Sequence, residues 1–344
     1  QSVSQSVSQS VSQSVSQSGN SRDFQFDNLK AFLIILVVFG HCLEEFGTDG
    51  DIYGSLRAMI YCFHMPAFVF ISGYFTYGHN ENKAKLIQNT LIPFFICNTA
   101  FELIVSRSLR INIFTPVYIY WYLLSLFIWR CSIGCLKKVK GLLIIAVAMS
   151  LYIGLVSQAD RFLAAQRTFA FFPFFVLGYI VSEKRICNQI KKIPIWLAVT
   201  LFCLFETTVL YCHLKGRIPV KTWENIQSYE ASGVSNFSGV LIRCLALVIG
   251  TFIIICLFRI SPNKKLLFTS LGMRTDCIFV LSGFTVKFVS TLIKRSFDYD
   301  KLSVQYVVII SLIETLIIVA FLGNKRVSRA YKNCISKIGG MFLK

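Results

Sequence analysis

Two histidines that stand in apolar sequence are the side chains best placed to do chemistry in this chain. His41 ends a largely apolar run that starts after Asp27, and His64 lies in the segment Phe63-His64-Met65-Pro66. An ionisable side chain inside a membrane span is costly, so it usually marks a functional site. We therefore expect both histidines to belong to such a site.

Two carboxylates follow His41 at helical spacing. Glu44 and Glu45 stand three and four residues further on, where a carboxylate can touch the imidazole ring. A carboxylate that orients a histidine and stabilises its protonated form supplies the base of a triad-like arrangement. The alternative is that His41 bonds to a neighbouring helix while both glutamates face water at the end of the span.

For His64 and Ser72 the local sequence also allows a structural role. Pro66 opens the helical hydrogen-bond ladder, so His64 either takes part in catalysis or bonds to a backbone carbonyl that the proline frees. The pair Ser72-Gly73 indicates close helix packing rather than a nucleophile, because no base lies at helical spacing from the serine.

The composition is that of a polytopic membrane protein. The chain has 344 residues, of which 55% are hydrophobic, and a mean hydropathy of +0.62. The net charge of +18 comes mostly from short loops between apolar runs, which argues against a nucleic-acid partner. The twelve cysteines show no metal-ligand spacing, so we expect buried apolar thiols and no metal site.

Ten apolar runs predict an all-α fold with about ten transmembrane helices. With the N-terminus in the cytoplasm, about twice as many lysines and arginines fall on the inner side as on the outer side, which predicts that both termini are cytoplasmic. The ninth run is interrupted by Arg274, Asp276 and Lys287. The ten predicted spans cover residues 28–46, 56–77, 86–105, 115–133, 141–157, 166–183, 193–212, 238–258, 267–290 and 303–322.

Both ends of the chain differ from the transmembrane domain, which we place at residues 22–322. Residues 1–21 form a polar tail in which Gln-Ser-Val-Ser recurs, and such low-complexity sequence cannot bury enough surface to order itself. A tetranucleotide repeat read in triplets would encode this period, which suggests a slippage-prone tract that switches expression by phase variation. Residues 323–344 are predicted to be a basic cytoplasmic tail.

Several blocks of the sequence together resemble the membrane acyltransferase-3 family, especially its fucose-4-O-acetylase-like branch. The resemblance covers about residues 22–322. The blocks are Arg22, Asp27, the spacing of Lys30 to His41, Phe63-His64-Met65-Pro66, Ile71-Ser72-Gly73-Tyr74-Phe75, Trp121-Tyr122-Leu123, Arg167 ahead of Phe172-Pro173-Phe174-Phe175-Val176-Leu177-Gly178-Tyr179, and Leu271-Gly272-Met273-Arg274-Thr275.

The resemblance implies an activity and roles for particular residues. Members of this family are multi-spanning enzymes that move acyl groups, commonly acetyl from acetyl-CoA, to hydroxyls of cell-surface glycans. His41 would then be the catalytic histidine and Lys30 the basic partner in its motif. Arg22, Asp27 and Arg167 are expected on the side of the acetyl-CoA co-substrate.

The implied reaction is attack of a sugar hydroxyl on the thioester carbonyl. His41 would act as general base, and Glu44 or Glu45 would hold its ring. Lys30 precedes His41 by eleven residues, which puts both on one helix face about 16 Å apart. From there Lys30 could pair with phosphates of acyl-CoA, whose pantetheine arm would reach His41.

Related sequences often carry a histidine in the ninth span, where this chain has Ser282.

Other conspicuous residues have ordinary structural interpretations. Arg57, Arg167 and Arg274 lie near span ends, where long side chains reach lipid head groups. The aromatic cluster within 118–122 predicts an anchor at the membrane interface. The longest outer loop, residues 213–237, is a candidate lid that faces the acceptor.

Two other function classes fit the same composition. One is a transporter or flippase for a lipid-linked glycan, and the other is a membrane sensor without chemistry. Transporters often contain internal repeats, and no clear repeat relates the two halves of this sequence. The two histidine segments favour the enzyme, whose acceptor would be a glycan such as lipopolysaccharide or capsule. We expect contact with membrane lipid and a bacterial inner-membrane location.

Overall fold

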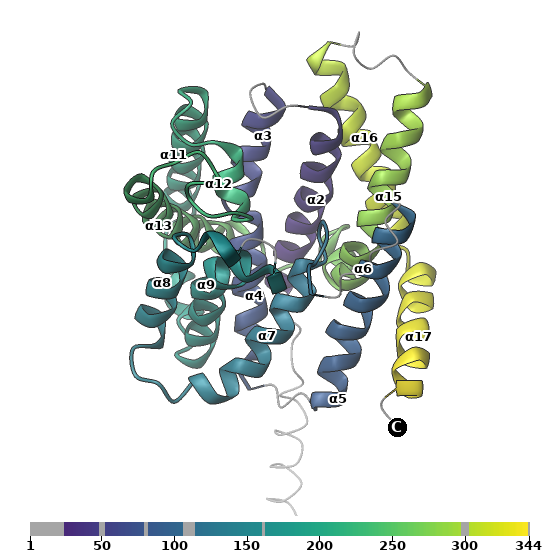
Figure 1. The fold of residues 1–344 in the computed structure, drawn as a ribbon, viewed down its shortest axis with the longest axis horizontal. Helices are drawn as coiled ribbons and strands as arrows, with labels where there is room; N and C mark the ends of the chain where they lie inside the picture. Colours follow the sequence, from purple (N-terminus) through teal and green to yellow (C-terminus); the bar gives the residue numbers. More distant parts are fainter. Residues whose placement is uncertain are drawn as a thin grey trace, which may run out of the picture.

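The computed structural model describes residues 24–47, 52–78, 82–105, 114–159, 162–296 and 303–342, and every regular element in these ranges is helical. The repeat tail and Arg22 lie outside the described residues. The predicted all-helical fold is thereby confirmed (Figure 1). The helices are α2 Phe24–Phe46, α3 Ile52–Tyr61, α4 His64–Thr76, α5 Lys83–Leu86, η1 Ile87–Leu91, α6 Ile92–Ile104, α7 Trp121–Leu136, α8 Leu142–Ile153, η2 Ser157–Ala159, η3 Phe162–Ala164, α9 Ala165–Glu183, α10 Cys187–Ile190, α11 Ile195–Leu214, α12 Val220–Glu224, α13 Asn236–Ile260, α14 Thr269–Gly272, α15 Thr275–Ser296, α16 Val304–Leu322 and α17 Lys325–Phe342.

Seven helical segments are long and apolar enough to cross a membrane. They are Phe24–Phe46, Ile52–Thr76, Phe162–Glu183, Ile195–Leu214, Asn236–Ile260, Thr275–Ser296 and Val304–Leu322. The other three predicted spans are present as α7 and α8, which are shorter apolar helices, and as α6 preceded by the π-helical turn η1. The count of ten and the cytoplasmic position of both termini therefore stay predictions.

The second span is interrupted where the sequence contains a histidine and a proline. Helix α3 ends at Tyr61 and α4 begins at His64. Pro66 lies in the first turn of α4, where a missing backbone N–H costs little. The Nδ1 atom of His64 bonds to the carbonyl oxygen of Ile60 at 2.9 Å, which satisfies a carbonyl that the broken helix leaves without its usual partner.

Two glycines allow α4 and α9 to pack with their backbones in contact. A Cβ atom on Gly73 would lie 2.0 Å from the carbonyl oxygen of Phe175, and one on Gly178 would lie 2.0 Å from the carbonyl oxygen of Phe70. Small residues of this kind let membrane helices approach closely. The interpretation of Ser72-Gly73 as a packing site is confirmed.

A methyl group on Gly178 should loosen this contact. We expect Gly178→Ala to lower the free energy of unfolding by about 1–3 kcal/mol, the usual cost of overpacking. Thermal unfolding in detergent measures the change. Gly134→Ala in α7 is the control, because nothing lies within 4 Å of a Cβ atom there. An equal loss in both variants would contradict the packing argument.

Helix α2 lies at the centre of the bundle and packs against α3, α4, α13, α14, α15 and α16. Its first turns are tied to the segment before α14, because Asn28 donates to the carbonyl oxygens of Pro262 and Lys264, both at 2.8 Å. A Cβ atom on Gly272 would lie 1.8 Å from the carbonyl oxygen of Asp27, so α14 also packs directly on the α2 backbone. These contacts fix the axial position of the helix that carries both Lys30 and His41.

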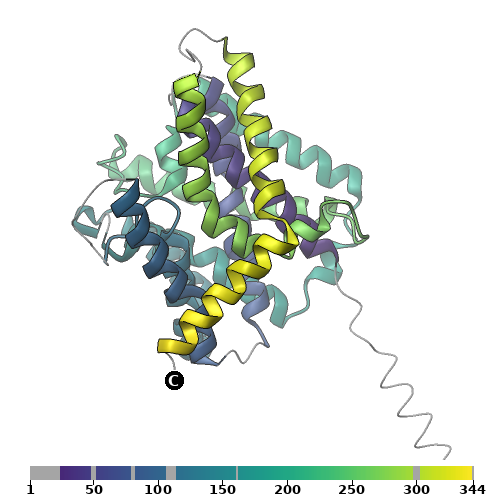
Figure 2. The ribbon, with the colours of Figure 1, turned by 90° about the vertical axis from the view of Figure 1, so that its right-hand side faces the viewer.

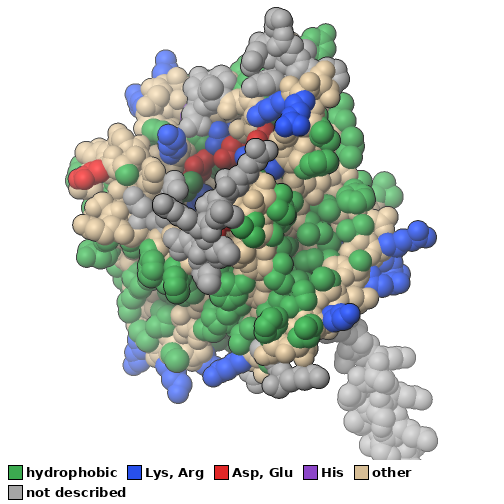
Figure 3. Space-filling model, turned by 45° about the vertical axis from the view of Figure 1, so that its right-hand side comes forward, with side chains coloured by type: hydrophobic (Ala, Val, Ile, Leu, Met, Phe, Trp, Pro, Cys, Tyr) green, Lys and Arg blue, Asp and Glu red, His purple; other side chains and the backbone are tan. Residues whose placement is uncertain are grey.

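The basic C-terminal segment is a helix that packs on the bundle. Helix α17 contacts α6, η1, α15 and α16, and the chain bends sharply between α16 and α17 (Figure 2). The face of the bundle in Figure 3 carries a broad hydrophobic belt, with lysines and arginines along its lower edge. Above the belt, acidic and basic side chains gather in a hollow on the same face (Figure 3).

Candidate active site

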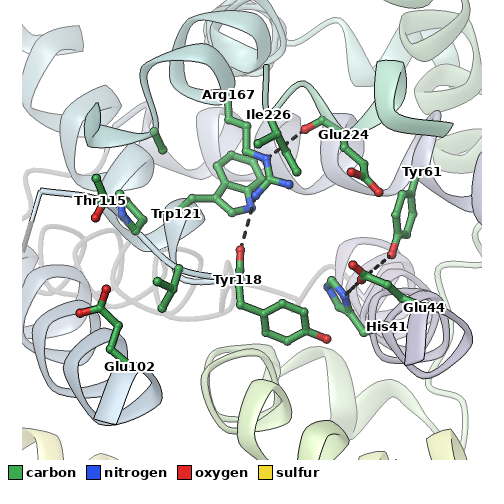
Figure 4. A pocket seen from close by; sticks show the side chains of 13 residues that line it. His41, Glu44, Tyr61, Glu102, Thr115, Tyr118, Trp121, Arg167, Glu224 and Ile226 are labelled. Atoms are coloured by element: carbon green, nitrogen blue, oxygen red, sulfur yellow. Dashed lines mark hydrogen bonds and ion pairs between the residues drawn. The ribbon is translucent and has the colours of Figure 1, made fainter. Parts of the chain in front are cut away.

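A cavity of about 380 Å³ opens beside His41, and we refer to it as the His41 cavity (Figure 4). Its walls come from the C-terminal ends of α2, α3 and α6, from residues 115–118 before α7, from the start of α9, and from α12. The side chains that give it polar character are His41, Glu44, Tyr61, Glu102, Arg167 and Glu224. Residues far apart in the sequence are therefore brought around one histidine.

Glu44 holds the His41 ring. The distance from His41 Nδ1 to Glu44 Oε2 is 3.0 Å. Because a carboxylate only accepts, Nδ1 carries the hydrogen, which leaves Nε2 free to accept a proton. The Tyr61 hydroxyl donates to the same carboxylate oxygen at 3.4 Å. The structure thus contains the oriented histidine that the sequence predicts from the i+3 carboxylate.

Glu45 has a different set of partners, so it does not hold the His41 ring. Lys287 of α15 donates to Glu45 Oε1, and Lys294 lies 3.9 Å from Glu45 Oε2. The two lysines approach from a neighbouring helix, and their charge attracts the carboxylate away from the histidine. Helical spacing alone could not distinguish the two glutamates, because both stand within reach of His41.

Arg57 and Arg167 do not reach lipid head groups, so that interpretation is wrong for both. Arg57 is 5% exposed, and its guanidinium donates to Glu224 Oε1 at 2.8 Å. Arg167 Nε donates to the backbone carbonyl of Glu224 at 3.0 Å. Two arginines from α3 and α9 thus hold α12 over the His41 cavity.

Part of the loop predicted as a lid, namely Glu224 and Ile226, does line this cavity.

Tyr118 is part of the cavity wall and not an interfacial anchor. Its ring centroid lies 4.8 Å from that of His41 and 5.3 Å from that of Phe101, on which it stacks. Arg167 Nη1 contacts the backbone carbonyl of Tyr118 at 3.4 Å, and its guanidinium lies 4.8 Å from the Trp121 ring centroid. The aromatic cluster therefore faces the protein interior, where it frames the histidine.

A smaller cavity of about 50 Å³ lies next to the His41 cavity. We call it the His64 constriction. It shares His41, Tyr61 and Arg167 with the His41 cavity, and His64 stands in its wall. Met65 and Phe279 line its other end, and both also line a third cavity.

This third cavity has a volume of about 550 Å³, and we call it the Lys30 cavity. Its basic side chains are Lys30, Arg130 and Lys332. Lys30 forms an ion pair with Asp27 at 2.8 Å, so the motif aspartate positions the lysine. Helix α17 contributes Tyr331, Lys332, Ile335 and Ser336 to the wall, which sequence reasoning missed when it treated residues 323–344 as a separate tail.

The predicted site residues thus divide into separate groups. His41 and Glu44 line one cavity, Lys30 with its ion-pair partner Asp27 belongs to the other, and His64 lines the constriction that shares residues with both. Glu45 lies nearby, but it forms ion pairs with Lys287 and Lys294 of α15. Arg167, which was expected on the side of the co-substrate with Lys30, lines the His41 cavity and not the Lys30 cavity. Ser282 donates to its own helix at Phe279 and is absent from the three cavity walls.

Sequence reasoning missed Tyr61, Glu102 and Tyr118, which line the His41 cavity, and Arg57, which donates to the cavity residue Glu224. The sequence did contain one usable signal, because Glu102 and Arg57 are charges inside or beside predicted spans. Nothing in the order of residues 115–118 indicates that this stretch would leave the helix and turn toward His41. The arrangement offers an oriented base, buried charge and two cavities that each share wall residues with the His64 constriction, and these features suit transfer of a group between two bound molecules.

Comparison with known proteins finds two curated relatives that each match part of the chain. The sequence is 29% identical over 184 residues to the Nodulation protein NolL of Mesorhizobium japonicum, which covers 48% of this chain and 49% of that protein. It is 47% identical over 62 residues to the Nodulation protein NolL of Sinorhizobium fredii, which covers 17% of each. The chain therefore spans about half the length, or less, of these curated relatives. No solved structure matches it.

The family assignment rests on a much longer match. The acyltransferase-3 family model, described as an acyltransferase domain, matches residues 23–323. This range includes both histidine segments, all seven candidate spans and every residue of the His41 cavity. The chain therefore belongs to the acyltransferase-3 family.

Proposed function

We propose that the protein transfers a short acyl group, most simply acetyl, from acyl-CoA to a hydroxyl of a cell-surface glycan. One observation carries this proposal. The His64 constriction shares His41, Tyr61 and Arg167 with the His41 cavity and Met65 and Phe279 with the Lys30 cavity, so a donor in one cavity and an acceptor in the other would meet at His41. Of the three cavities, His41 lines the His41 cavity and the His64 constriction, and Lys30 of the same helix lines the Lys30 cavity.

The Lys30 cavity suits the CoA portion of the donor. Lys30, Arg130 and Lys332 offer positive charge for phosphates, and apolar side chains such as Met65 and Phe279 lead to the constriction. Along α2, Lys30 and His41 are about 16 Å apart, a length that an extended pantetheine arm spans. The thioester would then reach His41 while the phosphates stay in the Lys30 cavity.

The His41 cavity suits a sugar. Glu44, Glu102 and Glu224 supply carboxylates that accept hydrogen bonds from hydroxyls, and Trp121 supplies an aromatic face. With the predicted orientation, this cavity faces the outside of a bacterial inner membrane, where lipopolysaccharide or capsule precursors are found. The acyl group would cross the membrane through the constriction while CoA stays on the cytoplasmic side.

The reaction follows from the geometry at His41. The Nε2 atom takes the proton from the acceptor hydroxyl as that oxygen attacks the thioester carbonyl. Glu44 accepts from Nδ1 and stabilises the imidazolium that forms. When the tetrahedral intermediate collapses, the C–S bond breaks and the CoA sulfur receives the proton from His41. The products are an O-acylated glycan and free CoA.

Reconstituted protein tests this proposal directly. Proteoliposomes are supplied with labelled acetyl-CoA on one side and the glycan or its lipid-linked precursor on the other, and the glycan mass is measured. We expect a gain of one acyl group that depends on the protein. Movement of unmodified lipid-linked glycan across the bilayer, without any mass gain, would instead favour the transporter alternative.

Lys332 should contribute to donor affinity. It lines the Lys30 cavity, where it lies 3.6 Å from Asp276. We expect Lys332→Gln to raise the KM for acyl-CoA about tenfold, the value of one charge-assisted hydrogen bond to a phosphate, with kcat little changed. Lys337→Gln removes a charge from the same helix outside the cavity and should leave KM unchanged. Equal effects of the two variants would contradict this position for CoA.

A further inference from the structure

The Tyr118 hydroxyl is the starting point, because it is buried without any hydrogen-bond partner among the described residues. The residue lines the polar His41 cavity, where partners are otherwise plentiful. A buried donor without a partner costs about 1–3 kcal/mol, and in a polar cavity a bound water or ligand can take up this hydrogen bond. The neighbouring Tyr61 hydroxyl differs, since it donates to Glu44.

The backbone of Tyr118 adopts a conformation that non-glycine residues avoid. Its φ angle is +51°, and such a left-handed residue costs about 1–3 kcal/mol. Three contacts hold the turn in place. Arg167 Nη1 contacts the Tyr118 carbonyl oxygen at 3.4 Å, the Val117 N–H donates to Asn98 Oδ1 at 2.8 Å, and the Tyr120 N–H donates to the Val117 carbonyl at 3.1 Å.

This strained turn places the phenol ring against the catalytic histidine. The ring stacks on Phe101 at an interplanar angle of 17°. The Nζ atom of Lys287, a residue of α15, lies 5.2 Å from the centroid of the Tyr118 ring. Figure 4 shows the Tyr118 hydroxyl on the side of the ring that faces His41 and Glu44. Because the ring is fixed by neighbours, the hydroxyl needs no rearrangement to act on a group bound at His41.

The protonation state of Tyr118 also suits a donor. Burial raises the pKa of its phenol well above the ordinary value of 10, and the negative charges of Glu44 and Glu45 raise it further. A phenol with a raised pKa stays protonated through the neutral range, so it donates a hydrogen bond and does not compete with His41 as a base.

We propose that the Tyr118 O–H donates a hydrogen bond to the carbonyl oxygen of the acyl group during transfer. The assignment rests on the acyl-CoA reaction described above. When the acceptor oxygen bonds to the carbonyl carbon and its proton moves to His41, the carbonyl electron pair shifts to oxygen. The Tyr118 hydroxyl stabilises this oxyanion without losing its proton. As the C–S bond breaks, the carbonyl re-forms and the CoA sulfur takes the proton from His41.

The variant Tyr118→Phe tests the assignment, because it keeps the ring and its stack on Phe101 and removes only the hydroxyl. We expect kcat for glycan acylation to fall about 10²-fold, as when a single oxyanion donor is removed. The KM values for acyl-CoA and for the glycan should stay within about twofold, because the bond strengthens only in the transition state. Tyr306→Phe, at an exposed position on α16, is the matched control and should retain full activity.

Other outcomes would overturn the assignment. Unchanged kcat would show that the hydroxyl plays no part in the reaction, and a rise confined to the KM for the glycan would make Tyr118 an acceptor-binding residue. Rates are expressed per folded protein, counted by gel filtration in detergent, so a loss of folded material does not imitate a loss of kcat. Wild-type protein that moves no acyl group would refute the proposed function itself, which separates that failure from this one.

Discussion

Replacing His41 with alanine is expected to abolish acyl transfer and leave the protein folded. The variant removes Nε2, the atom that takes the proton from the acceptor hydroxyl, and general bases of this kind contribute about 10²–10⁴-fold in rate. Glycan mass spectrometry of cells that express the intact protein, the variant or neither measures the effect. A mass gain of one acyl group should be found only with the intact protein.

Two further variants make this experiment specific to the active histidine. Glu44→Gln keeps an oxygen that accepts from His41 Nδ1 but removes the charge that stabilises the imidazolium, so its activity should lie between wild type and His41→Ala. His213→Ala removes a histidine of α11 whose Nδ1 lies 3.4 Å from the Ile218 carbonyl oxygen, away from the cavities. It should leave acylation intact. Acylation that survives in His41→Ala would refute the general-base mechanism.

Removal of the Arg57 charge should produce the largest loss of stability. Arg57 and Glu224 form a buried ion pair with a distance of 2.8 Å, and their side chains are 6% and 13% exposed. Arg57→Met leaves the Glu224 carboxylate buried without this cation, which costs about 3–5 kcal/mol when one partner of a buried pair is deleted. Thermal unfolding in detergent should therefore begin well below the wild-type temperature.

A double variant separates the loss of charge from the loss of packing. In Arg57→Met with Glu224→Leu both charges are gone, so most of the stability should return. Lys332→Met, which breaks the exposed pair with Asp276, should cost less than about 1 kcal/mol. If the double variant were no more stable than Arg57→Met, the arginine would act through packing alone.

The fold class follows from the sequence because a lipid environment leaves few alternatives. Apolar runs of about 20 residues must satisfy their backbone groups internally, so they become helices whatever their partners are. The same reasoning predicted the seven long helices that the structure contains. It overestimated the length of α7, because residues 115–118 line the His41 cavity and α7 begins only at Trp121.

Within α2, helical geometry alone placed the main chemical groups. The eleven-residue spacing separates Lys30 from His41 along one helix, and the structure finds them at two different cavities. The i+3 spacing likewise put Glu44 within reach of the His41 ring. Local periodicity is reliable here because both partners of each relation belong to the same rigid element.

Tertiary structure decided everything that depends on a second element. Glu45 stands within helical reach of His41, as Glu44 does, yet the lysines of α15 bind it. Arg57 lies near a span end, yet Glu224 from a distant loop keeps it inside the protein. Tyr118 resembles an interfacial aromatic, yet its strained turn directs it to the histidine. In each case a side chain has several partners within reach, and only the packing of distant helices determines which one it meets.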